Sequence, residues 1–345
     1  MARQRGFRSD NTSGVCPEAW ATLEEANRDH APAYGEDRWT ARATELVREA
    51  VGAADCAVFF LFTGTAANAL ALAALCPPHG IVGVTPNAHV LTDECGAPGF
   101  FGHGLQLQVL ATRLGKLDPT GIAGWATLND VHVGKPSALS LSQCTELGTV
   151  YSLSELEALR GVARQHRLKL HLDGARLANA CASLGATPAE IAQAAGAHTL
   201  VLGGTKNGMM GSEALVFFDP AAAEDFAFRR KQTGQLASKQ RFIAAPWVGM
   251  LESEAWLRYA TRANEHAASL AAGVARLGLG PVHPCEANEV FMSLTSAQAG
   301  ELETRGWPLY FESEWGGFRA VCSWDTSAED VADFVRDLES VARGA

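Results

Sequence analysis

The chain has 345 residues, of which 47% are hydrophobic and 19% charged, and its 38 acidic and 28 basic residues leave a formal net charge of -10. These proportions exclude a disordered chain and are typical of a globular enzyme with about two domains. The negative charge argues against nucleic-acid binding. The longest relevant apolar run, residues 56–62, is far shorter than the ~20 residues of a membrane span, so we also expect no membrane association.

The N-terminus and the cysteines restrict the function further. Residues 1–5 include two arginines, but no apolar segment follows them, so we expect no secretory signal and a cytoplasmic protein. Eight cysteines are scattered without a CxxC pair or a histidine spacing typical of zinc, so we predict no metal site. We interpret most of these cysteines as small buried side chains.

Short β-rich apolar runs alternate with Ala- and Leu-rich amphipathic stretches between residues 56 and 218. This alternation is typical of an α/β fold, in which helices cover both faces of a mostly parallel sheet. The predicted strands are 56–62, 81–85, 105–111, 138–142, 168–172, 199–202 and 213–218. The predicted helices are 65–76, 152–165, 176–184 and 188–196.

The pattern changes after residue 220, where long helices are predicted over 221–231 and 242–277. Three strands, at 290–294, 308–311 and 319–323, and a closing helix at 327–342 then predict a small α+β unit. We therefore expect an N-terminal arm over 1–30, a large domain over 31–250 and a small domain over 251–345.

The segment from Phe62 to Asn68 leads from a predicted buried strand through Gly64 directly into an Ala-rich helix. Such a junction points free backbone N–H groups and a partial positive charge toward an anion, and Thr65 adds a hydroxyl donor. The segment matches neither G-x-G-x-x-G nor a P-loop. A phosphate site and a tight turn capped by Thr65 both fit these residues.

An aspartate ends the predicted strand over 168–172, in the sequence His-Leu-Asp-Gly-Ala-Arg at 171–176. Ligands of open α/β sheets bind at the carboxyl ends of the strands, where Asp173 would project. The same carboxylate could instead cap the helix that follows.

A lysine follows the predicted strand over 199–202, in the sequence Gly-Gly-Thr-Lys-Asn-Gly at 203–208. A lysine among small residues at the end of a buried strand can lose its hydration and become a nucleophile toward carbonyl groups. Most lysines are solvated surface groups, so Lys206 taken alone leaves both interpretations open.

The three features together match the needs of one cofactor. Pyridoxal phosphate requires an anion site for its phosphate, a lysine for covalent attachment and a carboxylate that keeps its ring nitrogen protonated. Asp173 and Lys206 are separated by about one helix and one strand, which places both at strand ends. The sequence therefore predicts a pyridoxal-phosphate protein.

Eight short segments, spread along the whole chain, match motifs of a known family in the same order. They are Arg-Ser-Asp-Asn at 8–11, Ala-Tyr-Gly-Glu-Asp at 33–37, the loop at 63–68, Ala-His at 88–89, the segment 171–176, Gly-Thr-Lys at 204–206, Arg-Lys-Gln-Thr-Gly at 230–234 and Arg-Ala-Val-Cys-Ser-Trp-Asp at 319–325. On these motifs the sequence resembles the low-specificity L-threonine aldolases and their phenylserine-cleaving relatives. Those proteins are fold-type I pyridoxal-phosphate enzymes.

The resemblance implies a role for each matching residue around the cofactor. Lys206 would carry the cofactor covalently, Asp173 would pair with the pyridine nitrogen, and Arg176 would reach the phenolic oxygen of the ring. Gly64 and Thr65 would hold the phosphate.

Further roles are implied at positions that the residues alone would not single out. His89 would stack over the cofactor ring, and Lys231 would reach the phosphate of a neighbouring subunit, which implies a homodimer at least and commonly a tetramer. Ser9 and Arg319 would bind the carboxylate of the amino-acid substrate, a task that suits the planar fork of arginine. Without the family, Arg319 reads as a surface charge at a strand edge.

One position departs from the family pattern. Many members carry a second active-site histidine in a Thr-His-Asn-Gly segment, whereas this chain has Thr-Glu-Leu-Gly at 145–148. The task of deprotonating the substrate hydroxyl would then fall to Glu146, a water molecule or His89. A structural role for Glu146 in the turn before Gly148 is the alternative.

The reaction that the resemblance implies is retro-aldol cleavage of a β-hydroxy-α-amino acid, such as threonine, allo-threonine or phenylserine, to glycine and an aldehyde. A β-eliminating lyase or an aminotransferase of the same fold would keep the lysine and the aspartate. A non-catalytic pyridoxal-phosphate-binding protein would keep the phosphate site but would not need Ser9 and Arg319, so this pair favours catalysis.

Overall fold

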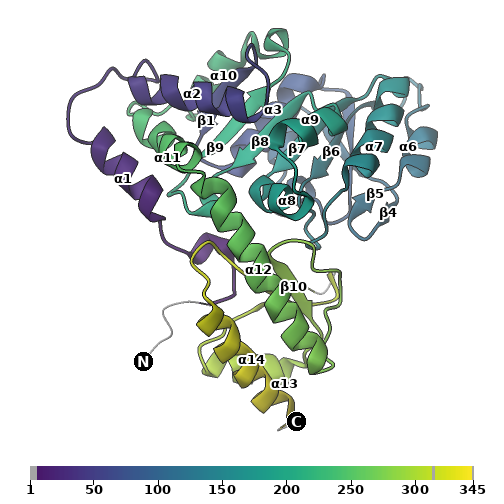
Figure 1. Ribbon diagram of the computed structural model, residues 1–345. Coiled ribbons are helices and arrows are strands. Elements are labelled where there is room, and N and C mark those ends of the chain that lie inside the picture. The colour runs from purple at the N-terminus through teal and green to yellow at the C-terminus, as the bar shows by residue number, and fades with distance from the viewer. Residues whose placement is uncertain (1–5, 313–314, 344–345) are drawn as a thin grey trace.

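The computed structural model describes residues 6–312 and 315–343, and its largest sheet has the strand order β1-β9-β8-β7-β6-β2-β3 (Figure 1). Every neighbouring pair is parallel except the two that involve β9, which is antiparallel to β1 and β8. The strands are β1 (Ala57–Leu61), β2 (Gly80–Val84), β3 (Gln106–Val109), β6 (Lys135–Ser142), β7 (Lys169–Gly174), β8 (Thr199–Gly203) and β9 (Glu213–Phe217). The predicted mostly parallel sheet and all seven of its predicted strands are confirmed.

Helices cover both faces of this sheet. On β8 and β9, Val201 and Leu215 pack against α3 (Gly64–Leu75), whereas Leu200 and Val216 belong to the core on the other face. Alternate side chains of a strand point to opposite faces, so the sheet is buried on both sides, which explains the continuous apolar runs in its sequence. The second face is covered by α7 (Leu153–His166), α8 (Leu177–Leu184) and α9 (Pro188–Ala195).

Several elements lie outside the predictions. They are α1 (Pro17–Ala26), α2 (Arg38–Ala50), α4 (His89–Thr92), α5 (Ala97–Phe101), α6 (Pro119–Trp125), α13 (Ser296–Thr304) and the hairpin of β4 (Thr112–Arg113) and β5 (Lys116–Leu117). In α2 the buried residues Trp39, Ala43, Leu46 and Val47 have the spacing of one helix face, a signal that the sequence does contain.

The predicted helix over 242–277 is wrong as a single element. It is two helices, α11 (Arg241–Glu252) and α12 (Ala255–Arg276), because Glu254 adopts a left-handed φ of 57° that interrupts the helix. The predicted helix over 221–231 is likewise a 3-10 turn, η3 (Pro220–Ala223), followed by the shorter α10 (Phe226–Gln232).

The predicted α+β unit near the C-terminus is confirmed. Its antiparallel sheet has the order β10-β12-β11, from β10 (Glu289–Met292), β11 (Tyr310–Glu312) and β12 (Gly317–Val321), and α14 (Ala328–Arg343) closes it.

Two main hydrophobic cores divide the chain, one around the large sheet and one around the small sheet. Helix α12 takes part in both, since Trp256 and Tyr259 pack in the first and Leu270 and Val274 in the second. Phe7 packs in the second core, with its ring centroid 5.5 Å from that of Trp307. The domain boundaries at 30 and 250 stay predictions. Among the described residues, no helix combines the length and the apolar character that a bilayer requires.

Candidate active site

A cavity of about 250 Å³ opens where several strands of the large sheet end and α3 begins. It brings together seven of the residues singled out in the sequence, namely Gly64, Thr65, His89, Glu146, Asp173, Arg176 and Lys206. Ser9, Lys231 and Arg319 do not line it.

The anion-binding part of the cavity is the first turn of α3. The N-cap of this helix is Thr63, whose side chain accepts a hydrogen bond from Ala66 N at 3.2 Å, so Thr65 is not the capping residue. The N–H groups of Gly64 and Thr65 belong to the first turn, where no helical partner is available. A Cβ on Gly64 would meet nothing within 4 Å, so open space lies beside this backbone. The junction is therefore suited to a phosphate group.

Asp173 lies on β7 as a buried carboxylate. Its Oδ1 accepts from Ala175 N at 2.9 Å and its Oδ2 from Asn68 Nδ2 at 2.7 Å. Helix α8 begins only at Leu177, so Asp173 does not serve as its N-cap. Burial alone would raise the pKa of Asp173, but the charge of His89 and the hydrogen bond from Ala175 outweigh it, and the net pKa is lowered. The side chain is thus held as an anion.

Asn68 fixes the orientation of Asp173 through a buried network. Its Nδ2 donates to Asp173 and also to Glu94 Oε1 at 2.9 Å, while its Oδ1 lies 3.0 Å from His171 Nε2. The network assigns the His171 proton to Nε2, and Nδ1 then accepts from the Thr199 hydroxyl at 2.9 Å. Burial lowers the pKa of His171 to about 4, so its ring is neutral at pH 7.

Lys206 follows β8 in a 3-10 turn, η2 (Thr205–Asn207), and faces the cavity. A Cβ at Gly203 would lie 2.1 Å from the Ala175 carbonyl oxygen, so only glycine allows this close approach of the two chain segments. Glu213 on β9 lines the same cavity and was missed in the sequence, although an acid opening an apolar strand is a recognisable signal. Its Oε2 accepts from Gly204 N at 3.1 Å, and burial raises the pKa of Glu213 to about 7.

His89 and Glu146 are joined at the next part of the cavity. The backbone N–H of His89 donates to Glu146 Oε1 at 2.9 Å, and Ser142 Oγ donates to the same oxygen at 2.5 Å. Glu146 Oε2 is buried and has no hydrogen-bond partner among the described residues. Burial raises the pKa of Glu146 to about 7, whereas the hydrogen bond between His89 Nδ1 and Glu94, 2.9 Å long, raises the pKa of His89.

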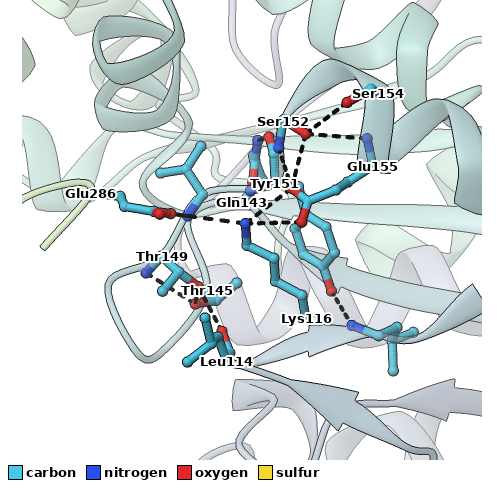
Figure 2. Close-up of polar contacts among 12 residues, drawn as sticks. Leu114, Lys116, Gln143, Thr145, Thr149, Tyr151, Ser152, Ser154, Glu155 and Glu286 are labelled. Carbon is cyan, nitrogen blue, oxygen red and sulfur yellow. Dashed lines mark hydrogen bonds and ion pairs between the residues drawn. The ribbon is translucent and has the colours of Figure 1, made fainter. Parts of the chain in front are cut away.

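The loop that carries Glu146 is held by bonds between its own residues (Figure 2). The side-chain amide of Gln143 donates to the Tyr151 carbonyl at 2.8 Å and accepts from the Tyr151 N–H at 2.9 Å. The hydroxyl groups of Thr145 and Thr149 are 2.7 Å apart. One pair of bonds joins Gln143 to Tyr151 at the base of the loop, and the Thr145–Thr149 contact joins its two sides nearer the tip. Together they fix the backbone conformation around Glu146.

Arg176 makes its shortest bonds to a residue that sequence reasoning did not single out. Its Nε donates to Asp10 Oδ2 at 2.7 Å and its Nη2 to Asp10 Oδ1 at 3.0 Å, a two-bond ion pair that ties the N-terminal segment to the cavity wall. Burial opposes ionisation of Asp10, but the charge of Arg176 outweighs it and lowers the Asp10 pKa. The role of Arg176 toward the phenolic oxygen stays a prediction.

The three remaining predicted residues lie outside the cavity lining. Ser9 caps the turn η1 (Asp10–Thr12), where its Oγ accepts from Asn11 N at 3.2 Å. Lys231 on α10 places its amine 4.8 Å from the centroid of the Tyr34 ring. Arg319 on β12 lies 3.4 Å from the carboxylate of Glu289.

Within residues 6–312 and 315–343, no group of three or more histidine, cysteine, aspartate or glutamate side chains could hold a metal ion. Six of the eight cysteines are buried, as predicted, and the two others are Cys95 and Cys285.

The fold and the site together define a fold-type I pyridoxal-phosphate enzyme, and the side chains present fit that cofactor. An anionic Asp173, the amine of Lys206 and the free N–H groups at the start of α3 face one cavity. These are the charges and donors that the ring nitrogen, the aldehyde and the phosphate of the cofactor require.

Comparisons with known proteins specify the family. A family model described as Beta-eliminating lyase matches residues 6–297. The low specificity L-threonine aldolase of Pseudomonas aeruginosa is 51% identical over 337 residues, which are 97% of each chain, and that of a Pseudomonas species is 48% identical over the same shares. The solved threonine aldolase of Leishmania major superposes with a TM-score of 0.90 at 28% identity, over 98% of this chain and 99% of that one. The chain therefore belongs to the beta-eliminating lyase family, among its low specificity L-threonine aldolases.

Proposed function

We propose that this protein cleaves β-hydroxy-α-amino acids of the L-threonine, L-allo-threonine or phenylserine type to glycine and an aldehyde. One observation carries the proposal: Lys206, Asp173 and the start of α3 face one cavity in a chain that matches threonine aldolases almost end to end. When bound there, pyridoxal phosphate supplies an acceptor for the electrons of the Cα–Cβ bond.

The residues around the cavity divide the remaining tasks. Lys206 attaches the cofactor, and the N–H groups of Gly64 and Thr65 bind its phosphate. Asp173 stabilises the positive charge on the ring nitrogen, and Arg176 lies on the cavity wall for the phenolic oxygen. His89 would cover the ring of the bound cofactor, and its hydrogen bond to Glu94 fixes the orientation of its imidazole.

The substrate hydroxyl must lose its proton as the carbon–carbon bond breaks. Glu146 is the base that this cavity supports best, because its Oε2 makes no hydrogen bond among the described residues and can accept that proton. A pKa of about 7, raised by burial, matches such a task at neutral pH. Ser142 and the His89 backbone hold the other oxygen in place.

Glu146→Gln is expected to lower kcat roughly 100-fold, the scale of a lost general base. In the wild type, kcat should fall as the pH drops below about 7, because protonation of Glu146 removes the base. That acidic limb should disappear in the variant, as measured by a pH–rate profile. Glu157→Gln, an exposed change on α7, is the control. An intact kcat with an unmoved acidic limb would assign the proton to His89 or water.

Arg319→Ala is expected to raise the KM for threonine at least about 10-fold while the absorption spectrum of the bound cofactor survives, since its guanidinium is assigned to the substrate carboxylate together with Ser9. Steady-state kinetics and a cofactor spectrum measure the two effects. Arg319→Lys should be intermediate, because an ammonium group keeps the charge but loses the fork. Unchanged kinetics in both variants would remove Arg319 from the site.

The proposal includes a homo-oligomer, a dimer at least and a tetramer by resemblance. Lys231 then serves the phosphate of the neighbouring subunit, which agrees with its position outside the cavity of its own chain.

The test of the reaction is a panel of threonine, allo-threonine and phenylserine with the purified holoenzyme. Glycine and the matching aldehyde should appear in equal amounts. Pyruvate or another 2-oxo acid in place of glycine would identify a β-eliminating lyase or an aminotransferase. No product from any of these substrates would leave a protein that binds the cofactor without turnover.

A further inference from the structure

Glu289 is a buried carboxylate at the start of β10, between the two parts of the chain. The residue is 1% exposed, and neither of its carboxylate oxygens has a hydrogen-bond partner among the described residues. Gly148 packs over it, since a Cβ there would lie 3.1 Å from the Glu289 carbonyl oxygen. A buried charge in this position requires compensation from nearby cations.

Two arginines provide that compensation through one oxygen. Glu289 Oε1 lies 3.5 Å from Arg176 Nη2 and 3.4 Å from Arg319 Nη1. Nη2 of Arg176 and Nη1 of Arg319 are therefore at most about 7 Å apart, although only Arg176 of the two lines the cavity. Glu289 thus links the cavity wall to the arginine assigned to the substrate carboxylate.

The two arginines differ in how their donors are used. Arg176 donates two short hydrogen bonds to Asp10, from its Nε and its Nη2. Arg319 stacks on Trp315, with 5.2 Å to the ring centroid, and its buried Nε has no hydrogen-bond partner within residues 6–312 and 315–343. Its contact with Glu289, 3.4 Å long, exceeds an ordinary hydrogen bond, so Glu289 offsets the charge of Arg319 without using its Nε donor.

We propose that Glu289 is a resident counter-charge that weakens the hold of Arg319 on carboxylates, so that glycine can leave the site after cleavage. An unopposed buried guanidinium would bind any carboxylate tightly, because desolvated charge pairs are strong. With Glu289 in place, the carboxylate of an incoming ligand binds an arginine that already interacts with an anion. The negative charge of Glu289 also repels that carboxylate, which weakens its binding. Glu289 acts through Arg319 and is a positioning residue. The inference rests on the proposed function, which supplies glycine as the product.

Glu289→Gln in the holoenzyme tests this role, because the amide keeps the size of the side chain and removes its charge. Titration calorimetry with glycine and with acetate should give Kd values at least about 5-fold lower than those of the wild type. The KM for threonine should fall as well. The Kd for ethanolamine, which has the amine but no carboxylate, should stay the same. A merely structural role for Glu289 would instead raise the Kd and KM values.

The control is Glu301→Gln, which removes one negative charge from an ion pair on the surface of α13 and should leave glycine binding unchanged. Should Glu289→Gln not fold, Glu289→Met removes the charge with a side chain of similar length and is tested in the same way. Unchanged or raised Kd values for glycine and acetate in a folded variant would overturn the inference. A wild type that releases no glycine from any substrate would instead refute the proposed function.

Discussion

Lys206→Ala is expected to lower the cleavage of threonine by at least about 1,000-fold, because no second lysine lines the cavity among the described residues. The wild type should be yellow as purified, and the variant should retain cofactor only by non-covalent contacts. Borohydride reduction followed by peptide mapping should label Lys206 in the wild type and no lysine in the variant.

The control for this experiment is Lys169→Ala, which removes an exposed lysine from the start of β7, before the strand reaches the cavity. Its colour and kcat should match those of the wild type. A label on a lysine other than Lys206 would overturn the assignment on which the proposed site depends.

Asp173→Asn is expected to fold and to lose nearly all activity, on the order of 1,000-fold, because an amide cannot stabilise a protonated ring nitrogen as a carboxylate does. The amide has a single acceptor oxygen, which can keep the bond from Asn68 Nδ2 but not the bond from Ala175 N as well, so the variant loses one hydrogen bond of the wild-type carboxylate. Steady-state kinetics measure the loss, and near-normal turnover would contradict the role of Asp173.

Asp173→Asn should also change how the stability of the folded protein depends on pH. The folded state lowers the pKa of Asp173, so the carboxylate stabilises the fold above its ordinary pKa near 4, and this contribution is lost as the pH falls through the lower folded-state value. Asp173→Asn has no such group to titrate. Thermal unfolding at several pH values should therefore show a smaller loss of stability toward low pH in the variant than in the wild type.

The sequence by itself determined the strands of the large sheet and the order of the residues that face the cavity. Buried strands such as β8 and β9 are recognisable because they are apolar on both faces. Gly64, Asp173 and Lys206 each follow or end such a strand, and parallel strands bring their carboxyl ends to one edge. The sequence thus placed these three residues together without any contact being known.

Only the tertiary structure decided which charges face these residues. Asp10 and Arg176 are 166 residues apart, and Asn68 and Asp173 are 105 residues apart. No local sequence pattern therefore predicts that either pair is in contact. In the sequence, Glu213 and Glu289 are simply acidic residues at the starts of strands. The structure places Glu213 in the cavity lining and Glu289 between Arg176 and Arg319. Local periodicity reports which face of an element is buried, whereas the partner of a buried charge depends on how distant elements dock.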